Sequence, residues 1–218
     1  MTVIGINGSP RKKWNTATLV DKALEGAAAQ GAETGLIHLY DLDFKGCVSC
    51  FVCKTLGNKS YGTCGFNDAL MPVLKKIAQA DALVIGSPIY FGSVTGETRS
   101  FLERLLFPYL TYTANYGSIA PKQIPTAFIY SMNVTEEQSK AYGYEQIFNT
   151  NARYLQMIFG QKSETLCSFD TCQFADYSKV LMESFDPVHK AKRREEVFPS
   201  DCQGAYRLGE RLAGKVSR

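Results

Sequence analysis

The sequence predicts a doubly wound α/β fold with three α/β/α layers, in which a five-stranded parallel sheet has the strand order 2-1-3-4-5. Two observations favour this fold. Short apolar segments of strand length alternate along the chain with amphipathic segments of helical length, which is the pattern of βαβ units. The apolar segments also lack the alternation of a half-exposed strand, so we expect helices on both faces of the sheet.

The first half of the chain is expected to supply three strands and two helices. The apolar run 2–7 ends in a Gly-Ser-Pro turn and forms the first strand. The helical pattern over 15–31 begins with Asn15, a residue type that favours the N-cap position, and ends in a glycine. Residues 35–40 are the second strand, and a helix over 67–77 leads to the third strand at 81–86.

The second half continues the same alternation. Its expected elements are a helix over 95–106, a strand over 126–130, a helix over 142–159 and a strand over 164–169. From about residue 177 the chain is mostly helical and ends on an amphipathic helix near 205–216. We therefore expect a single domain over residues 1–218, with a helical C-terminal extension.

Composition and charge argue against several functions. The 218 residues are 45% hydrophobic, enough for one sizeable core, and the net charge of +3 comes from mixed acids and bases rather than from the basic stripe of a nucleic-acid-binding protein. We interpret the basic cluster Lys190–Arg194, which two glutamates follow, as a solvated helix face. No apolar run reaches the ~20 residues of a membrane span. The first turn comes too early for a secretion signal, so we expect a cytoplasmic protein.

The turn after the first strand has the features of a phosphate-binding loop. Residues 8–16 lead into the first helix, whose N-terminus offers free N–H groups and a partial positive charge. Ser9, Asn15 and Thr16 can donate hydrogen bonds, and Arg11 adds a charged fork of donors. The loop has neither a G-x-G-x-x-G fingerprint nor the Gly-Lys-Ser/Thr of a Walker loop, which disfavours a Rossmann-type dinucleotide or a triphosphate. An ordinary polar turn is the alternative.

The turn after the third strand, residues 86–96, offers a surface for a flat ring. Tyr90 and Phe91 lie between a Ser-Pro pair and a Gly-Ser pair. Core packing is the alternative role for two aromatic residues. Their place in a turn, rather than on a periodic core face, favours the ring surface.

Together the two turns resemble the NADPH-dependent FMN reductase family of the flavodoxin superfamily, over about the first two-thirds of the chain. The resemblance implies non-covalently bound FMN. Its phosphate would be contacted by Ser9, Arg11, Asn15 and Thr16, and its ring by Pro88, Ile89, Tyr90, Phe91 and Gly92. A third turn, after the fourth strand, would bring Met132 and Asn133 to the other edge of the ring.

Four cysteines crowd into the long loop between the second strand and the second helix. Cys47, Cys50 and Cys53 have C-x2-C-x2-C spacing, and Cys64 follows. Three thiolates at this spacing can hold one corner of a cubane cluster that a fourth cysteine completes. The pattern resembles the iron–sulfur flavoproteins of the same superfamily and implies a [4Fe–4S] cluster, although the gap before Cys64 is longer than is usual there. A metal-free thiol loop and a structural zinc site are the alternatives.

These patterns predict an FMN-dependent oxidoreductase. NAD(P)H would reduce the bound FMN, and the reduced flavin would pass electrons to a flavin, a quinone or another small acceptor. The sequence has only two histidines and no readable Ser-His-Asp or Cys-His arrangement, which suits a protein whose cofactor performs the chemistry. We therefore assign no catalytic acid or base. An electron carrier with a [4Fe–4S] cluster and a flavin-binding sensor are the alternatives.

The resemblance also implies a homodimer or a homotetramer. The aromatic-rich run 107–116 is a candidate for a subunit contact or a substrate entrance, since aromatic side chains are enriched at interfaces. A partly exposed loop packed on the edge of the sheet is the alternative.

Overall fold

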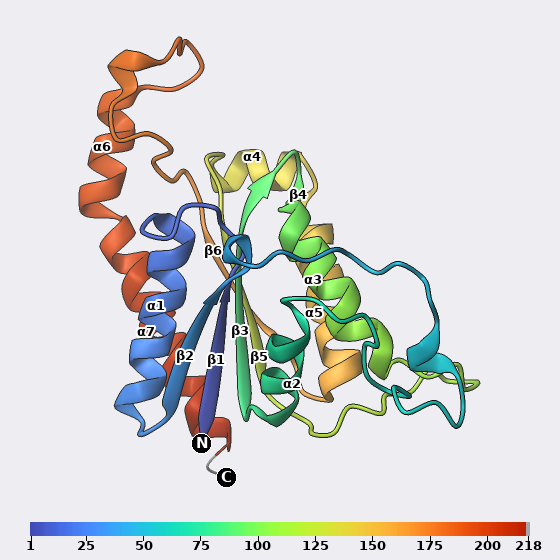
Figure 1. The fold of residues 1–218 in the computed structure, drawn as a ribbon. Helices are drawn as coiled ribbons and strands as arrows, with labels where there is room; N and C mark the ends of the chain where they lie inside the picture. Colours follow the sequence, from blue (N-terminus) through green and yellow to red (C-terminus); the bar gives the residue numbers. More distant parts are fainter. Residues whose placement is uncertain (217–218) are drawn as a thin grey trace.

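The central sheet of the computed structural model, which describes residues 1–216, has the strand order β2-β1-β3-β5-β6, and these strands are parallel (Figure 1). They span β1 Thr2–Asn7, β2 Glu33–His38, β3 Ala82–Tyr90, β5 Thr126–Ser131 and β6 Glu164–Ser168. A short strand, β4 Ser93–Val94, pairs antiparallel with the end of β3. Without this hairpin strand the order is 2-1-3-4-5, so the predicted fold is confirmed.

Helices cover both faces of the sheet (Figure 1). One face carries α1 Asn15–Ala29 and α7 Phe198–Val216, and the other carries α2 Met71–Gln79, α3 Gly96–Leu106 and α5 Tyr144–Phe159. The short helix α4 Glu136–Ala141 lies above the carboxyl ends of the strands, and α6 Pro187–Glu196 rises beyond α1. Four 3-10 turns occur at η1 Leu39–Asp41, η2 Val52–Lys54, η3 Phe107–Tyr109 and η4 Tyr177–Lys179.

Two apolar cores lie on either side of the sheet. Ile4 and Ile6 of β1 pack in the core under α2, α3 and α5, whereas Val3 packs in the core under α1 and α7. Successive side chains of a strand point to opposite faces, so continuous apolar strands fill both cores. α1 and α7 approach so closely that a Cβ atom on Gly26 would lie 2.0 Å from the carbonyl oxygen of Tyr206.

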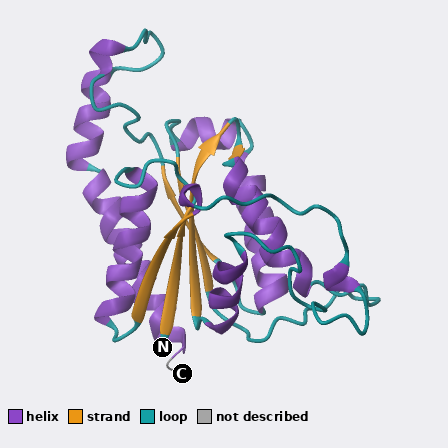
Figure 2. Cartoon of the chain, viewed as in Figure 1, coloured by secondary structure: helices purple, strands orange, loops and turns teal. Residues whose placement is uncertain are grey.

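The segment between β2 and α2 is mostly irregular and extends along the outer side of α3 (Figure 2). It contains the three cysteines of the C-x2-C-x2-C pattern and the later Cys64. Long irregular loops in compact domains are commonly functional. Within the described part of the chain, no helix is long and apolar enough to cross a membrane.

Several elements differ from the sequence predictions. β3 continues to Tyr90 instead of ending at residue 86, because its last residues pair with β4. Asn15 is not an N-cap: Trp14 holds that position and Asn15 begins the helix. The helix α4 was not predicted, although Thr135 and Gln138 form a capping box at its N-terminus.

The C-terminal extension also differs from its prediction. A helical region from about 177 was expected, but α6 begins at Pro187 and the last helix begins at Phe198. The interpretation of the basic cluster as a solvated face is wrong, because Lys190 and Arg193 are buried. Each has a carboxylate partner elsewhere in the chain: Asp170 for Lys190 and Asp201 for Arg193. Burial of a cation beside a carboxylate is invisible to charge patterning along the sequence.

Candidate functional site

The carboxyl ends of β1, β3 and β5 meet at one edge of the sheet, the upper edge in Figure 1. Hydrogen bonds join the loops that follow these strands. The hydroxyl of Thr95 donates to the carbonyl oxygen of Gly8 at 2.7 Å, and the amide of Gly8 donates to the carbonyl oxygen of Gly86 at 2.8 Å. The hydroxyl groups of Thr16 and Ser131 lie 2.7 Å apart. The three predicted loops therefore form one continuous surface, as expected at the switch point of a doubly wound sheet.

The first loop is shaped by a buried asparagine and a glycine. The side chain of Asn7 accepts from the amide of Ser9 and donates to its carbonyl oxygen, both at 3.1 Å, and lies 2.9 Å from Nδ1 of His38. A Cβ atom on Gly8 would lie 1.9 Å from Oγ1 of Thr98, so only glycine fits beside α3. The sequence pattern did not single out Asn7, because a polar residue at a strand end has many ordinary roles.

The N-terminus of α1 has the properties of an anion site. Trp14 is the N-cap, and no side chain in the described structure caps the helix by hydrogen bonding. The first turn contains no acidic residue, and Asn15 and Thr16 are buried there. Uncapped N–H groups and the helix dipole together favour a negative group at this position.

Two of the predicted phosphate contacts, Arg11 and Asn15, have protein partners in the segment that follows β6. The guanidinium of Arg11 donates to the carbonyl oxygen of Gln173. The side-chain amide of Asn15 donates to the carbonyl oxygen of Cys172 at 2.8 Å and accepts from Arg194 at 3.3 Å. These partners are separated from Arg11 and Asn15 by 162, 157 and 179 residues in the sequence, so local sequence patterns could not reveal them. Ser9 is buried in the first loop and Thr16 is buried in the first turn of α1.

The predicted ring surface is the end of a β-hairpin. Ile89 pairs with Val94, and Tyr90 pairs with Ser93. The turn residues Phe91 and Gly92 have φ values of 48° and 77°, as two-residue hairpin turns of type I′ require. Tyr90 is 43% exposed and Phe91 is fully exposed, so core packing is excluded for Phe91. Pro88 and Ile89 are half-buried beneath them.

Tyr40 lies in the middle of η1, directly after β2, and was not identified from the sequence. Its burial, followed by its hydrogen bond to Glu97, raises the pKa of Tyr40 to about 12. The contact ties the segment after β2 to α3, close to Tyr90 and Thr95.

The third loop is held from the far side by the chain that follows β6. The carbonyl oxygen of Met132 accepts from the amide of Thr171 at 2.8 Å and from its hydroxyl at 3.0 Å. Nζ of Lys190 donates to the carbonyl oxygen of Asn133 at 2.7 Å. The side-chain oxygen Oδ1 of Asn133 is buried and has no donor among the described residues. A buried acceptor without a donor is costly, which makes this atom a candidate ligand contact.

The four cysteines line one small cavity of about 20 Å³ against α3. Cys53 is buried, while Cys47 and Cys50 are exposed. Burial, together with the neighbouring thiols of Cys64, Cys50 and Cys47, raises the pKa of Cys53. Within residues 1–216, no three Cys, His, Asp or Glu side chains lie close enough together to hold a metal ion. The thiols share a cavity but do not form a ready ligand set.

Arg104 of α3 anchors the cysteine loop. This buried guanidinium forms a two-bonded ion pair with Asp68 and donates to the carbonyl oxygens of Lys45 and Phe66. Its Nε lies 3.3 Å from Sγ of Cys64. α2 begins at Met71 rather than at residue 67 as predicted, and Asp68, before it, also accepts from the amide of Leu70 at 3.1 Å.

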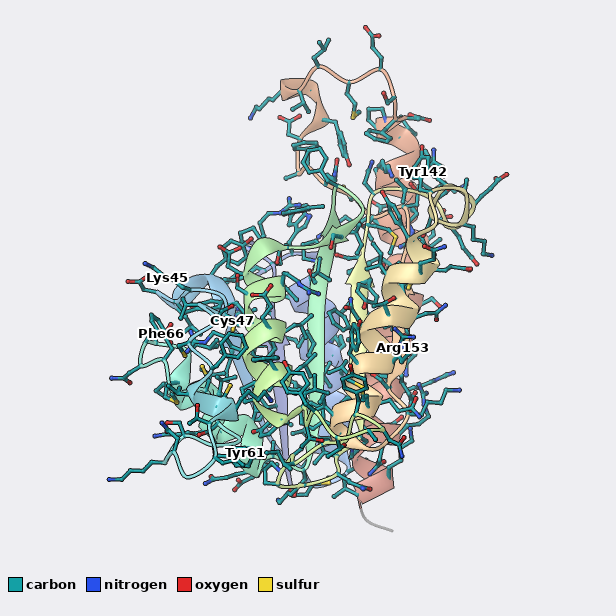
Figure 3. The ribbon with its side chains drawn as sticks, turned by 90° about the vertical axis from the view of Figure 1, so that its right-hand side faces the viewer. Lys45, Cys47, Tyr61, Phe66, Tyr142 and Arg153 are labelled. Carbon is teal, nitrogen blue, oxygen red and sulfur yellow. The ribbon has the colours of Figure 1, made fainter. Side chains whose placement is uncertain are left out.

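A larger groove of about 500 Å³ lies between the cysteine loop, α3 and α5. In Figure 3 the loop with Cys47 and Phe66 lies on one side of α3, and Arg153 of α5 lies on the other. The walls are mainly apolar and aromatic: Phe51, Leu102, Leu106, Phe107, Leu110, Tyr112, Tyr154, Met157 and Ile158. The predicted aromatic run 107–116 therefore contributes to this groove, away from the three loops at the sheet edge.

Comparison with curated proteins finds relatives for part of the chain. Iron–sulfur flavoproteins of Methanocaldococcus jannaschii and Archaeoglobus fulgidus are 40% and 39% identical to it over 104 residues. The matches cover 48% of this chain, and 51% and 48% of the two relatives. The chain thus spans about half the length of the curated relatives it matches.

Solved structures share the whole fold. An NAD(P)H:quinone oxidoreductase from Methanothermobacter marburgensis has a TM-score of 0.70 at 16% identity, covering 97% of this chain and 98% of its own. An FMN-dependent NADH-azoreductase from Bacillus anthracis, in complex with FMN, has a TM-score of 0.64 at 12% identity and covers 100% of both chains. At such identities the likeness concerns the fold alone.

The model of the NADPH-dependent FMN reductase family matches residues 1–158, which include all three loops and the four clustered cysteines. This match covers most of the chain and agrees with the resemblance of the two turns. The expected family is confirmed: the chain belongs to the NADPH-dependent FMN reductase family.

Proposed function

We propose that the chain is an FMN-dependent oxidoreductase that takes reducing equivalents from NAD(P)H and passes them to a flavin, a quinone or another small acceptor. The observation that carries this proposal is the acid-free N-terminus of α1, which no side chain caps in the described structure. The loop before it is hydrogen-bonded through Gly8 to Thr95, directly after the hairpin that exposes Phe91. Family membership supports the same function.

The residues present suit both the phosphate end and the ring end of FMN. The first-turn N–H groups of α1, with Ser9 and Thr16, would hold the phosphate. The hairpin residues Pro88–Gly92 would lie against the ring, and Asn133 supplies a buried acceptor for its polar edge. Bound FMN supplies the hydride-accepting chemistry, whereas the protein binds and orients it.

Titration of the purified protein with FMN tests this proposal. We expect a yellow complex with a dissociation constant in the micromolar range or below, which anaerobic NADPH or NADH bleaches and a quinone reoxidises. A folded protein that does not bind FMN at millimolar concentration, far weaker than a useful cofactor affinity, would refute it. Binding without any reduction by NADPH or NADH would instead indicate a carrier or a sensor.

A second candidate function, electron transfer through a [4Fe–4S] cluster, is favoured by the four cysteines that line one cavity. The donors suit a cluster in kind, and the curated relatives are named iron–sulfur flavoproteins. The cavity of about 20 Å³ is too small for four irons and four sulfides, so the loop would have to open to receive them. We therefore derive no electron-transfer step through this site.

Metal analysis after anaerobic purification separates the candidates for the cysteine loop. A cluster predicts about four irons and four sulfides per chain and a broad brown absorbance that the Cys50→Ser variant loses. Zinc without sulfide indicates a structural site. Flavin bands with neither metal indicate free thiols.

We also propose that the chain forms a homodimer or a homotetramer. The apolar groove between α3 and α5, where Tyr112 is 64% exposed, supports a subunit contact there. Light scattering of the purified protein measures the oligomeric state. A Tyr112→Glu variant should weaken the assembly, and a monomeric wild-type protein would contradict the proposal.

A further inference from the structure

The C-terminal strap, defined here as residues 170–196, folds back onto the first loop (Figure 1). It lies beyond the part of the chain that matches the family model. Its backbone receives two hydrogen bonds from the start of α1. Nε1 of Trp14 and Nδ2 of Asn15 both donate to the carbonyl oxygen of Cys172, at 2.9 Å and 2.8 Å.

Arg194 of the strap completes this contact. Its guanidinium lies 4.5 Å from the ring centroid of Trp14, and one of its nitrogens donates to Oδ1 of Asn15 at 3.3 Å. The guanidinium of Arg11 lies 5.1 Å from the centroid of the same ring. Two guanidinium groups thus lie over the ring of Trp14, which holds the N-cap position of α1 without capping it by a hydrogen bond.

The strap is itself anchored by two buried cations of α6 that precede Arg194 and form ion pairs. Lys190 pairs with Asp170 and donates to the carbonyl oxygen of Asn133 in the third loop. Arg193 pairs with Asp201 at 2.6 Å. Lys190 and Arg193 are both buried, which fixes the position of α6 against the rest of the chain. Arg194 is partly exposed and contacts Trp14 and Asn15.

We propose that Arg194 is a positioning residue for the phosphate of FMN, an inference that rests on the proposed function. By holding the side chain of Asn15 and the ring of Trp14, it fixes the first turn of α1, whose N–H groups bind the phosphate. The positive charge of Arg194 also lies beside the N-terminus of α1, where the doubly charged phosphate of FMN would bind. A site that is already ordered before the ligand arrives spends less free energy on ordering its groups during binding. Because the ordered groups contact the phosphate, only ligands that carry the phosphate should bind more tightly.

The ratio of the dissociation constants for riboflavin and FMN tests this role. Riboflavin shares the ring but lacks the phosphate, so it reports on the rest of the site. We expect Arg194→Ala to weaken FMN binding about tenfold and riboflavin binding less than twofold, which lowers the ratio. The matched control is Lys192→Ala, which removes the same charge from an exposed position of α6 and should leave both constants unchanged.

The outcomes separate this inference from the proposed function. An unchanged ratio in Arg194→Ala overturns the inference, whether both ligands bind normally or both weaken equally, because the latter indicates a purely structural role. A wild-type protein that binds neither ligand refutes the proposed function instead. If Arg194→Ala does not fold, Arg194→Met keeps the length of the side chain but removes both the donor for Asn15 and the charge, and a normal ratio in that variant likewise overturns the inference.

Discussion

A Cβ atom on Gly8 would lie 1.9 Å from Oγ1 of Thr98 and 3.0 Å from the carbonyl oxygen of Gly86, so a larger residue displaces the first loop. We expect Gly8→Ala to lower the free energy of unfolding by about 1–3 kcal/mol and to weaken FMN binding. Gly96→Ala is the control, because no atom lies within 4 Å of its added Cβ and alanine favours a helix. Urea denaturation and FMN titration should distinguish the two variants. Equal stability and equal FMN affinity of the two variants would contradict the close packing of Gly8 against Thr98.

The ion pair of Asp68 and Arg104 predicts a pH-dependent contribution to stability. Burial alone would raise the pKa of Asp68, but the hydrogen bonds and charge of Arg104 outweigh it and lower that pKa below 3.8. A lowered pKa stabilises the folded state above the unfolded value, and this contribution is lost as the pH falls through the folded value. Asp68→Asn also leaves the buried Arg104 without a counter-charge.

We therefore expect Asp68→Asn to lower the free energy of unfolding by about 3 kcal/mol at pH 7, and by progressively less as the pH falls below 3.8. Urea titrations of both proteins across this range measure the difference. Glu136→Gln is the control, since Glu136 pairs with Lys140 on the exposed surface of α4 and should have little effect. A difference that stays constant with pH would show that Asp68 does not titrate in the way described.

Individual site residues were predictable to different degrees. Ser9 and Thr16 follow from the position of a polar turn between a strand and a helix, because that position is set locally. Arg194 and Trp14 did not follow, because their contact depends on how the strap packs against α1. The partners of the buried Lys190 were hidden for the same reason.

At the scale of the element, the hairpin of β3 and β4 combines strain with exposure. Phe91 has a φ of 48° and is fully exposed, although an aromatic residue in this conformation costs about 1 kcal/mol. Asparagine adopts the left-handed region more readily. We expect Phe91→Asn to raise the free energy of unfolding by up to about 1 kcal/mol while weakening FMN binding. Thermal unfolding and FMN titration test both effects, and FMN affinity equal to wild type would contradict a role for this side chain at the ring.

The same hairpin shows where sequence patterns lose information about elements. The Gly86–Gly92 segment contains proline and glycine and predicts a turn. Pro88 and Ile89 nevertheless continue the strand, because Pro88 pairs with Ser131 of β5 and Ile89 pairs with Val94 of β4 in the folded chain. The buried strands β1 and β5 were identified well, since their continuous apolar runs arise from burial on both faces. The capping box of α4 was a local signal that could have revealed that helix.

At the scale of the whole molecule, strand order followed from alternation and handedness, because right-handed crossovers leave few arrangements for such a chain. The role of α7 did not follow. This last helix, beyond the family match, supplies Leu208 and Leu212 to the core under α1. The two cores share the strands of one sheet, so the loss of either core would destabilise the strands on which the other depends. We therefore expect residues 1–216 to unfold as one cooperative unit.

The α1–α7 contact provides a test of this cooperativity. A Cβ atom on Gly209 would lie 1.8 Å from the carbonyl oxygen of Ala23, so Gly209→Ala must push the two helices apart. We expect a loss of about 1–3 kcal/mol, with Trp14 fluorescence and far-ultraviolet circular dichroism shifting together in urea. Gly214→Ala, on the same helix with no atom within 4 Å of its Cβ, should be neutral or slightly stabilising. Two separate transitions in Gly209→Ala, with helical signal lost before the Trp14 signal, would instead show that the C-terminal helices form an independent unit.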